Sequence, residues 1–128
     1  MTDWIWVEAR VALAIHDEQL AEHGGAGGVR DAGAFESAMA RPVNLAAYGQ
    51  PDVAALAAAY GFGLARNHAF VDGNKRTAYV VAETFLALNG FILTSSDADS
   101  IMTFLALAAG DMTEAALADW FRTNARAA

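Results

Sequence analysis

The segment HAFVDGNKR, residues 68–76, gathers one histidine, one acid, one amide and two cations within a short stretch. An imidazole titrates close to neutral pH, so His68 is a candidate base for taking a proton from an attacking hydroxyl. Asp72 offers the hard oxygen that Mg²⁺ prefers, and Mg²⁺ normally accompanies the phosphates of a nucleotide. Lys75 and Arg76 add positive charge that would hold those phosphates. The segment therefore predicts phosphate chemistry at one bend of the chain.

The two cations lie at the predicted start of a helix that runs from about Asn74 to Leu88. Acidic residues normally occupy a first helical turn, because the helix dipole makes that end positive. A bound phosphate would explain the reversal, since the first-turn amides have no partner inside the helix. Gly73 would let a phosphate approach the backbone. The alternative is that the polar side chains here only cap the helix and that the cations lie in solvent.

A Walker-A loop, another common phosphate-binding segment, is excluded by its spacing. It needs a glycine, four residues and then Gly-Lys-Ser or Gly-Lys-Thr after a strand, whereas here Asn74 precedes Lys75 and Arg76 follows it. Lys75 is the only lysine of the chain, so its position calls for a local reason.

The composition predicts one domain, residues 1–128, with a hydrophobic core of its own. Of the 128 residues 55% are hydrophobic and none is cysteine, which excludes disulfides, thiolate zinc sites and cysteine nucleophiles. The net charge of −7 argues against direct binding of nucleic acid, because phosphate contacts need a basic surface. The longest apolar run, Val53 to Ala65, is shorter than the roughly 20 residues of a membrane span, and no signal peptide is evident. We expect a cytoplasmic protein without membrane contact.

Apolar residues recur at helical spacing in nearly every segment, which predicts an all-α fold, a compact bundle of about six helices. The expected ranges are Val7–Glu22, Asp31–Pro42, Pro51–Ala65, Asn74–Leu88, Ser96 or Asp97 to Ala109, and Thr113 or Glu114 to Thr123. Asp31 caps the second helix and Pro42 ends it, and a loop of about ten residues follows. Pro51 suits the first turn of the third helix, in which Gly61 and Gly63 are typical of close helix approach.

The segment HAFVDGNKR resembles the signature of the Fic/Doc family, and specifically of its death-on-curing (Doc) branch. The matching positions are His68, Phe70, Asp72, Asn74, Lys75 and Arg76. The stretches Ala14–Pro42 and Ala57–Ala78 are also similar to Doc toxins, so the resemblance covers about Val7 to Leu93. It implies a single Fic/Doc domain with the helical fold of that family.

Fic enzymes carry Asn-Gly-Arg, two further residues and a second arginine, and this chain departs from that pattern twice. Lys75 replaces the glycine and Tyr79 replaces the second arginine. In Doc toxins such a lysine accompanies a reversed ATP pose, which offers the γ-phosphoryl group rather than the adenylyl group. The resemblance therefore implies a protein Ser/Thr kinase that needs ATP and Mg²⁺. Its implied substrate is a threonine of elongation factor Tu, and the implied result is a toxin that arrests translation.

The resemblance also implies a role for each matched residue. His68 would be the general base and Asp72 the Mg²⁺ ligand, while Lys75 and Arg76 would stabilise charge on the phosphates during transfer. The residues implied to bind nucleotide are Arg66, Gly73, Asn74, Lys75 and Arg76. One departure is Val80, where a Doc sequence has asparagine, so any polar contact made there is absent or replaced.

The family further implies an inhibitor on another chain. Many Fic proteins carry an internal inhibitory segment in which glutamate precedes glycine or asparagine, and no glutamate of this chain has either neighbour. A Phd-like antitoxin is therefore the expected partner, inserting a segment near the active site. The loop Val43–Gln50 is expected to be the flap that receives the target chain.

Several alternatives stay open. One is adenylyl transfer as in Fic enzymes, which the missing second arginine disfavours. Another is a catalytically silent domain that binds an antitoxin as a co-repressor. His16 and His23 could suggest a metal pair, but no third ligand is evident and structural roles are favoured. The glycine-rich residues 24–30 are best explained as a helix stop followed by a turn.

Overall fold

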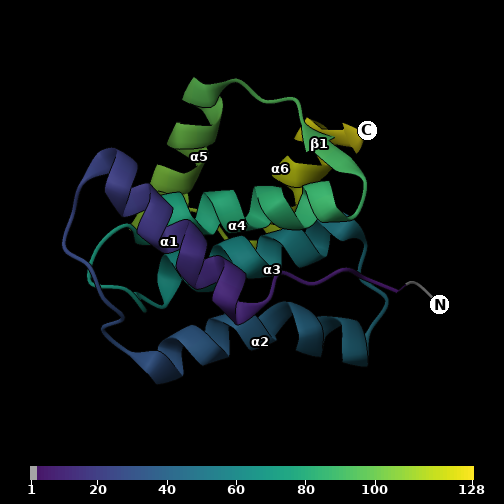
Figure 1. The fold of residues 1–128 in the computed structure, drawn as a ribbon. Helices are drawn as coiled ribbons and strands as arrows, with labels where there is room; N and C mark the ends of the chain where they lie inside the picture. The colour runs from purple at the N-terminus through teal and green to yellow at the C-terminus, as the bar shows by residue number, and fades with distance from the viewer. Residues whose placement is uncertain (1–2) are drawn as a thin grey trace.

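A computed structural model describes residues 3–128 and shows a bundle of helices with a very small sheet at one edge (Figure 1). The six helices of this described part are α1 (Ala9–His23), α2 (Ala32–Tyr48), α3 (Val53–Arg66), α4 (Asn74–Leu88), α5 (Asp97–Ala109) and α6 (Glu114–Asn124). The two strands are β1 (Phe91–Leu93) and β2 (Ala125–Ala127). The predicted bundle of helices is confirmed. Within residues 3–128 no helix has both the length and the apolarity that a membrane crossing requires.

Helix α3 is the centre of the fold, with α2, α4 and α6 packed around it (Figure 1). Most of its residues are buried, because neighbours cover it on several sides. Two glycines allow close contact. A Cβ at Gly63 would lie 3.2 Å from the Ala38 Cα of α2, and one at Gly61 would lie 3.3 Å from the Phe104 ring of α5. The close helix approach predicted from these glycines is confirmed.

Side-chain caps decide where four of the helices begin. The caps of α2, α3, α5 and α6 each accept a hydrogen bond from the backbone N–H three residues later, and they are Asp31, Asp52, Ser96 and Thr113. The predicted starts at Asp31, Ser96 and Thr113 are confirmed. The start at Pro51 is corrected, because the Asp52 carboxylate accepts from Ala55 N–H at 2.8 Å and so places Pro51 before the helix.

The predicted end of the second helix at Pro42 is wrong, because α2 continues through Pro42 to Tyr48. A proline inside a helix lacks the N–H that the carbonyl of Ala38 would accept, which weakens the helix locally. Pro42 is nevertheless fully buried on the same face as Phe35 and Ala38, where α2 packs on α3. Burial of this face offsets the local penalty, so most of the expected loop is helix.

Strands β1 and β2 pair antiparallel and tie the C-terminus to the segment after α4 (Figure 1). Phe91 lies opposite Ala127, and Leu93 lies opposite Ala125. The sequence does not predict this sheet, since three residues are too few for an alternating pattern to be recognised.

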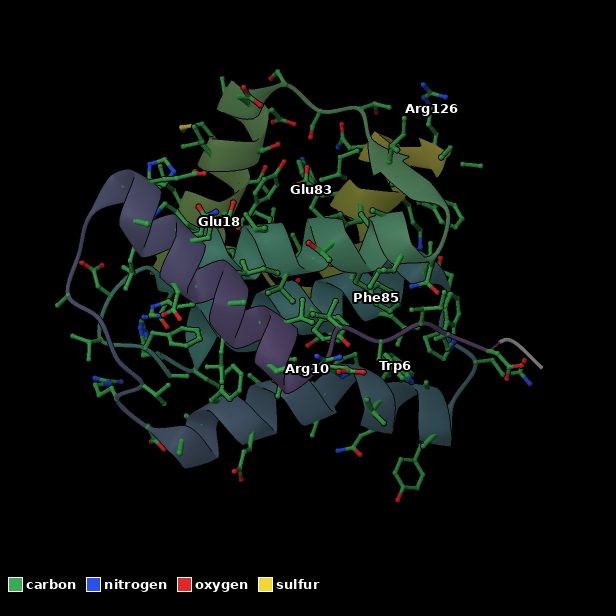
Figure 2. All side chains as sticks on the ribbon, in the orientation of Figure 1. Trp6, Arg10, Glu18, Glu83, Phe85 and Arg126 are labelled. Atoms are coloured by element: carbon green, nitrogen blue, oxygen red, sulfur yellow. The ribbon has the colours of Figure 1, made fainter. Side chains whose placement is uncertain are left out.

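Residues 4–7, before α1, lie along the hydrophobic core. Trp6 stacks on Phe85 of α4 with 5.8 Å between ring centroids, and both residues are labelled in Figure 2. The N–H of Val7 donates to the hydroxyl of Tyr60 at 3.0 Å. Burial raises the pKa of the Tyr60 hydroxyl to about 12. Through the hydrogen bond from Val7, Tyr60 links the N-terminal segment to the centre of α3.

Candidate active site

The motif bend, residues 67–73, joins the end of α3 to the start of α4. Ala69 and Phe70 are buried within it, whereas His68 and Asp72 are exposed. His68 has a φ of 51°, the single positive value among the described residues other than glycine. Such a conformation costs backbone energy, so neighbouring contacts must hold it. One of them is the hydrogen bond from Arg30 Nε to the His68 carbonyl at 3.1 Å.

The turn between α1 and α2 pairs with the motif bend. Val29 and Phe70 form an isolated antiparallel bridge. The flanking hydrogen bonds run from Arg30 and Asp31 N–H to the Ala69 carbonyl and from Val71 N–H to the Gly28 carbonyl. The sequence explains residues 24–30 only as a helix stop and a turn, and it misses this pairing because the partners are about 40 residues apart.

The loop expected at Val43–Gln50 is corrected by the structure, while its role as a flap stays a prediction. Helix α2 occupies this segment as far as Tyr48, and the segment makes no hydrogen bond to the motif bend among the described residues. The reason is again the continuation of α2 through Pro42. The chain that lies beside the motif bend is the turn between α1 and α2.

Asn74 uses its side chain to brace the motif bend. Its Oδ1 accepts from the N–H of Phe70 and its Nδ2 donates to the carbonyl of Phe70, both at 3.0 Å. These two bonds hold the first residue of α4 against the middle of the bend. The phosphate-orienting role implied for Asn74 stays a prediction.

An open cavity of about 510 Å³ lies where the motif bend, the start of α4 and the end of α5 meet. Six of the predicted site residues line it, namely His68, Asp72, Gly73, Asn74, Lys75 and Arg76. Leu105, Ala108 and Ala109 of α5 form an apolar part of its wall. Its volume is within the range of about 300–1,000 Å³ that is typical of small-molecule sites. The fold thus brings the candidate base, carboxylate and cations to one cavity.

The N-terminus of α4 lies at this cavity without a side-chain cap. Gly73 has φ 78° and ψ 17°, a left-handed conformation that favours glycine. Within residues 3–128 no side chain caps the first-turn amides, which are suited to an anion. Lys75 is exposed, and no ion pair within residues 3–128 uses it.

The side chain of Arg76 reaches back to the end of α1. Its Nη2 donates to the carbonyl of Gly24 at 3.2 Å. Its Nε is buried and has no hydrogen-bond partner among the described residues. A buried guanidinium nitrogen without an acceptor is costly, and a phosphate oxygen would be a suitable acceptor.

Asp72, the predicted metal ligand, is held by its neighbours. Its Oδ1 accepts from the N–H of Gly73 at 2.8 Å. Gly25 lies so close to it that a Cβ there would be 2.6 Å from Oδ2. No group of three or more acidic or histidine side chains suited to a metal occurs within residues 3–128. A single exposed carboxylate fits Mg²⁺ that takes its other ligands from phosphates and water.

Arg66 is the one predicted nucleotide-binding residue that does not line the cavity. Its guanidinium carbon lies 5.3 Å from the centre of the Phe62 ring, a cation–π contact. The same guanidinium lies beside Gly110, the residue that ends α5. Arg66 is therefore at the α5 border of the site, and its contact with phosphate stays a prediction.

A second, more apolar cavity of about 470 Å³ lies between α1, α4 and α5. It shares Lys75, Arg76 and Leu105 with the first cavity, so the two are adjacent. Tyr79, which departs from the Fic pattern, and Val80, which departs from the Doc sequence, both line it.

The two histidines of α1 have different environments, and the structural interpretation of His16 is supported. His16 is buried, with its ring stacked on Phe70 and its Nε2 2.8 Å from the carbonyl oxygen of Asp72. His23 is exposed at the end of α1. Sequence reasoning missed the contact of His16 with the motif bend, because no local pattern relates residues 56 positions apart.

The family model described as Fic/DOC family matches residues 6–86, which is more than half of the chain. The chain belongs to the Fic/DOC family. The matched part of this Fic/DOC protein includes the entire motif, all of α3 and most of α4.

Two curated relatives narrow the assignment. "Toxin Doc" of Mycolicibacterium smegmatis is 50% identical over 70 residues, which are 52% of this chain and 53% of that protein. The match thus spans about half the length of this relative. "Protein kinase doc" of Escherichia phage P1 is 33% identical over 111 residues, which are 86% of this chain and 87% of that protein. Both relatives are Doc proteins, so the predicted Doc branch is confirmed.

Proposed function

We propose that this protein is a toxin that transfers the γ-phosphoryl group of ATP to a threonine hydroxyl of elongation factor Tu and so blocks translation. One observation carries the proposal: His68, Asp72 and the uncapped N-terminus of α4 line a single cavity. The relative named as a protein kinase supports it, since it is 33% identical over 86% of this chain.

His68 is the proton acceptor of the proposed step. The threonine oxygen forms a bond to the γ-phosphorus while its proton passes to His68. The bond from the γ-phosphorus to the β–γ bridging oxygen breaks, and ADP leaves with that oxygen. His68 lines the cavity and is exposed, so a side chain of another protein can reach it.

The N-terminus of α4 holds the phosphates in this proposal. The free first-turn amides and the positive end of the helix dipole favour an anion at this position. Lys75 and the unpaired Nε of Arg76 add charged donors beside it. Donors that are already in place before the reaction stabilise the charge that moves in the transition state.

Asp72 would hold Mg²⁺, which supplies positive charge to the phosphates when it is bound. The contribution of the chain is to orient the carboxylate. The N–H of Gly73 holds one oxygen, and the missing side chain of Gly25 leaves room for the other.

Adenylyl transfer is the alternative, and the side chain of Tyr79 favours the kinase. Tyr79 stands where Fic enzymes have their second arginine, and its ring packs edge-on against Phe104 at 5.3 Å. Burial raises the pKa of its hydroxyl, so the side chain stays neutral at physiological pH. A neutral tyrosine does not provide the cationic contact of that arginine.

The proposed regulator is a Phd-like antitoxin on another chain. The apolar cavity between α1, α4 and α5 is adjacent to the site and offers a place for such a segment. Ile101 and Leu105 of α5 are exposed there, at 61% and 44%. An apolar segment bound to them would also cover Lys75.

The position of the label in ATP tests the proposal. The protein is incubated with elongation factor Tu, Mg²⁺ and ATP labelled at either the γ or the α phosphate. We expect label on the factor from γ-labelled ATP alone, and none with His68→Ala. Label from α-labelled ATP alone would refute the kinase and support adenylyl transfer. No label from either, with ATP still bound, would support the silent antitoxin-binding domain.

A matched pair of variants tests the phosphate site. Lys75→Gln and Arg126→Gln each remove one exposed cation, but Arg126 lies on β2 and lines neither cavity (Figure 2). We expect Lys75→Gln to lower the rate of transfer by about 100-fold, in line with the loss of one transition-state donor. Arg126→Gln should leave the rate unchanged. Equal rates in the two variants would remove Lys75 from the proposed mechanism.

A further inference from the structure

We propose that His16 is a positioning residue that sets the orientation of the Asp72–Gly73 peptide and thereby prepares the phosphate and metal site. This inference deepens the function proposed above and rests on it. His16 does not line the cavity, so it acts through the motif bend rather than on the substrate.

The hydrogen bond between His16 and the bend has a defined direction, with the histidine as donor. The ring is buried, with 2% of the residue exposed, and its Nε2 lies 2.8 Å from the carbonyl oxygen of Asp72. A carbonyl oxygen can only accept, so Nε2 carries the hydrogen and donates it. Among the described residues this is the hydrogen bond that the carbonyl of Asp72 receives.

The geometry of a peptide group turns this bond into an orientation of the site. No peptide bond in the described chain is cis, so the C=O of Asp72 and the N–H of Gly73 point in opposite directions. A carbonyl directed at His16 therefore directs the Gly73 N–H away from His16. There it donates to Oδ1 of Asp72 at 2.8 Å. The donor on α1 is thus coupled to the position of the carboxylate through one rigid peptide plane.

The face of the His16 ring restrains the same bend at a second point. It stacks on the ring of Phe70, with 3.7 Å between centroids and 9° between planes. Phe70 is itself buried and is braced by the side chain of Asn74. His16 therefore contacts the bend on both sides of Val71, once through stacking and once through a hydrogen bond.

The left-handed turn at Gly73 lies beside the Cδ2 and Nε2 atoms of the same ring. A Cβ at Gly73 would be 3.6 Å from Cδ2 and 3.7 Å from Nε2 of His16. Gly73 is also the N-cap position of α4, whose free amides form the proposed phosphate site. A change in the Asp72–Gly73 peptide would move both the carboxylate and the start of this helix.

A purely structural histidine would only fill space, and two substitutions separate this role from positioning. His16→Phe keeps an aromatic ring to stack on Phe70 but removes the donor. His16→Gln loses the stacked ring but keeps an N–H at similar reach. We measure the melting temperature of each variant, its affinity for ATP by calorimetry with and without Mg²⁺, and kcat and KM for γ-phosphoryl transfer.

If His16 positions the peptide, His16→Phe should lower kcat by about 10- to 100-fold, the usual effect of losing a group that orients a ligand. In His16→Phe, Mg²⁺ should also increase the affinity for ATP by less than in the unmodified protein. His16→Gln should recover most of the lost kcat and most of the lost effect of Mg²⁺. The inference is overturned if His16→Phe folds and keeps kcat and ATP affinity within twofold of the unmodified protein. It is also overturned if His16→Gln is as impaired as His16→Phe, since the donor would then have no role.

The unmodified protein supplies a test that does not depend on folding of the variants or on kinase activity. In the nitrogen-15 NMR spectrum, we expect a His16 Nε2–H signal that persists because its exchange with solvent is slow. A ring protonated at Nδ1 alone would overturn the inference. If the protein transfers no γ-phosphoryl group but this signal is present and ATP affinity follows the donor, the proposed function fails and the positioning role stands.

Discussion

The two hydrogen bonds between the Asn74 side chain and Phe70 should contribute measurably to the free energy of unfolding. In Asn74→Ala both bonds to Phe70 are lost, and the N–H and carbonyl of Phe70 lose their side-chain partner in a partly buried place. Each such unpaired group costs about 1–3 kcal/mol. The better helix propensity of alanine returns at most about 0.7 kcal/mol. Two costs of about 1–2 kcal/mol each, less the propensity gain of about 0.7 kcal/mol, lower the free energy of unfolding by about 1.3–3.3 kcal/mol.

The assay is equilibrium unfolding in urea, followed by helical circular dichroism. Asn44→Ala is the matched control, because Asn44 lies exposed on α2 and makes no side-chain hydrogen bond among the described residues. Its free energy of unfolding should stay constant or rise by about 0.5 kcal/mol, since alanine favours helix. A loss in Asn74→Ala within about 0.5 kcal/mol of this control would refute the bracing role. Unchanged stability with weaker ATP binding would show instead that the amide acts on phosphate.

Three further predictions concern the core. Thr77→Val should raise the free energy of unfolding by about 1 kcal/mol, because the buried Thr77 hydroxyl has no hydrogen-bond partner among the described residues. A lower free energy of unfolding in urea would show that the hydroxyl does have a partner. Gly63→Ala should lower the free energy of unfolding by about 1–3 kcal/mol, because the new methyl group pushes α3 away from Ala38. Gly33→Ala, at an exposed position of α2, should raise it by about 0.5–1 kcal/mol. Similar values for the two variants in the same assay would contradict the close contact. The Tyr60 hydroxyl has a pKa of about 12 in the folded protein and about 10 in the unfolded chain. Its contribution to the free energy of unfolding is therefore complete below pH 10, and about 2–3 kcal/mol of stability is lost as the pH rises to 12. When unfolding is measured across this pH range, the free energy of unfolding of Tyr60→Phe should fall less steeply with pH than that of the unmodified protein. An equally steep fall would assign the pH dependence to other groups.

Helix boundaries followed from the sequence where a local interaction decides them. Asp31, Ser96 and Thr113 cap helices through bonds to amides three residues away. Such bonds span less than one turn, so the residue type and its position relative to the apolar pattern are enough to predict them. The close contact at Gly63 was predictable for a similar reason, since a glycine inside a helix is typical of a close neighbour.

Boundaries that depend on packing were predicted wrongly or not at all. Pro42 ends a helix by local rules, yet α2 passes through it because its face is buried on α3. The loop expected at Val43–Gln50 was wrong for that reason. The pairing of β1 with β2 joins segments more than 30 residues apart, and no local pattern indicates it.

The candidate site shows the same division. The sequence alone determined which groups are present at the bend, because the types and spacing of His68, Asp72 and Lys75 carry the proposed chemistry and the family resemblance. The tertiary structure decided which of them share a cavity, and it left Arg66 at the border. It also decided that Asn74 braces Phe70 and that His16 reaches Asp72 from another helix. These contacts depend on how helices pack in space, and a linear spacing of residues does not contain that information.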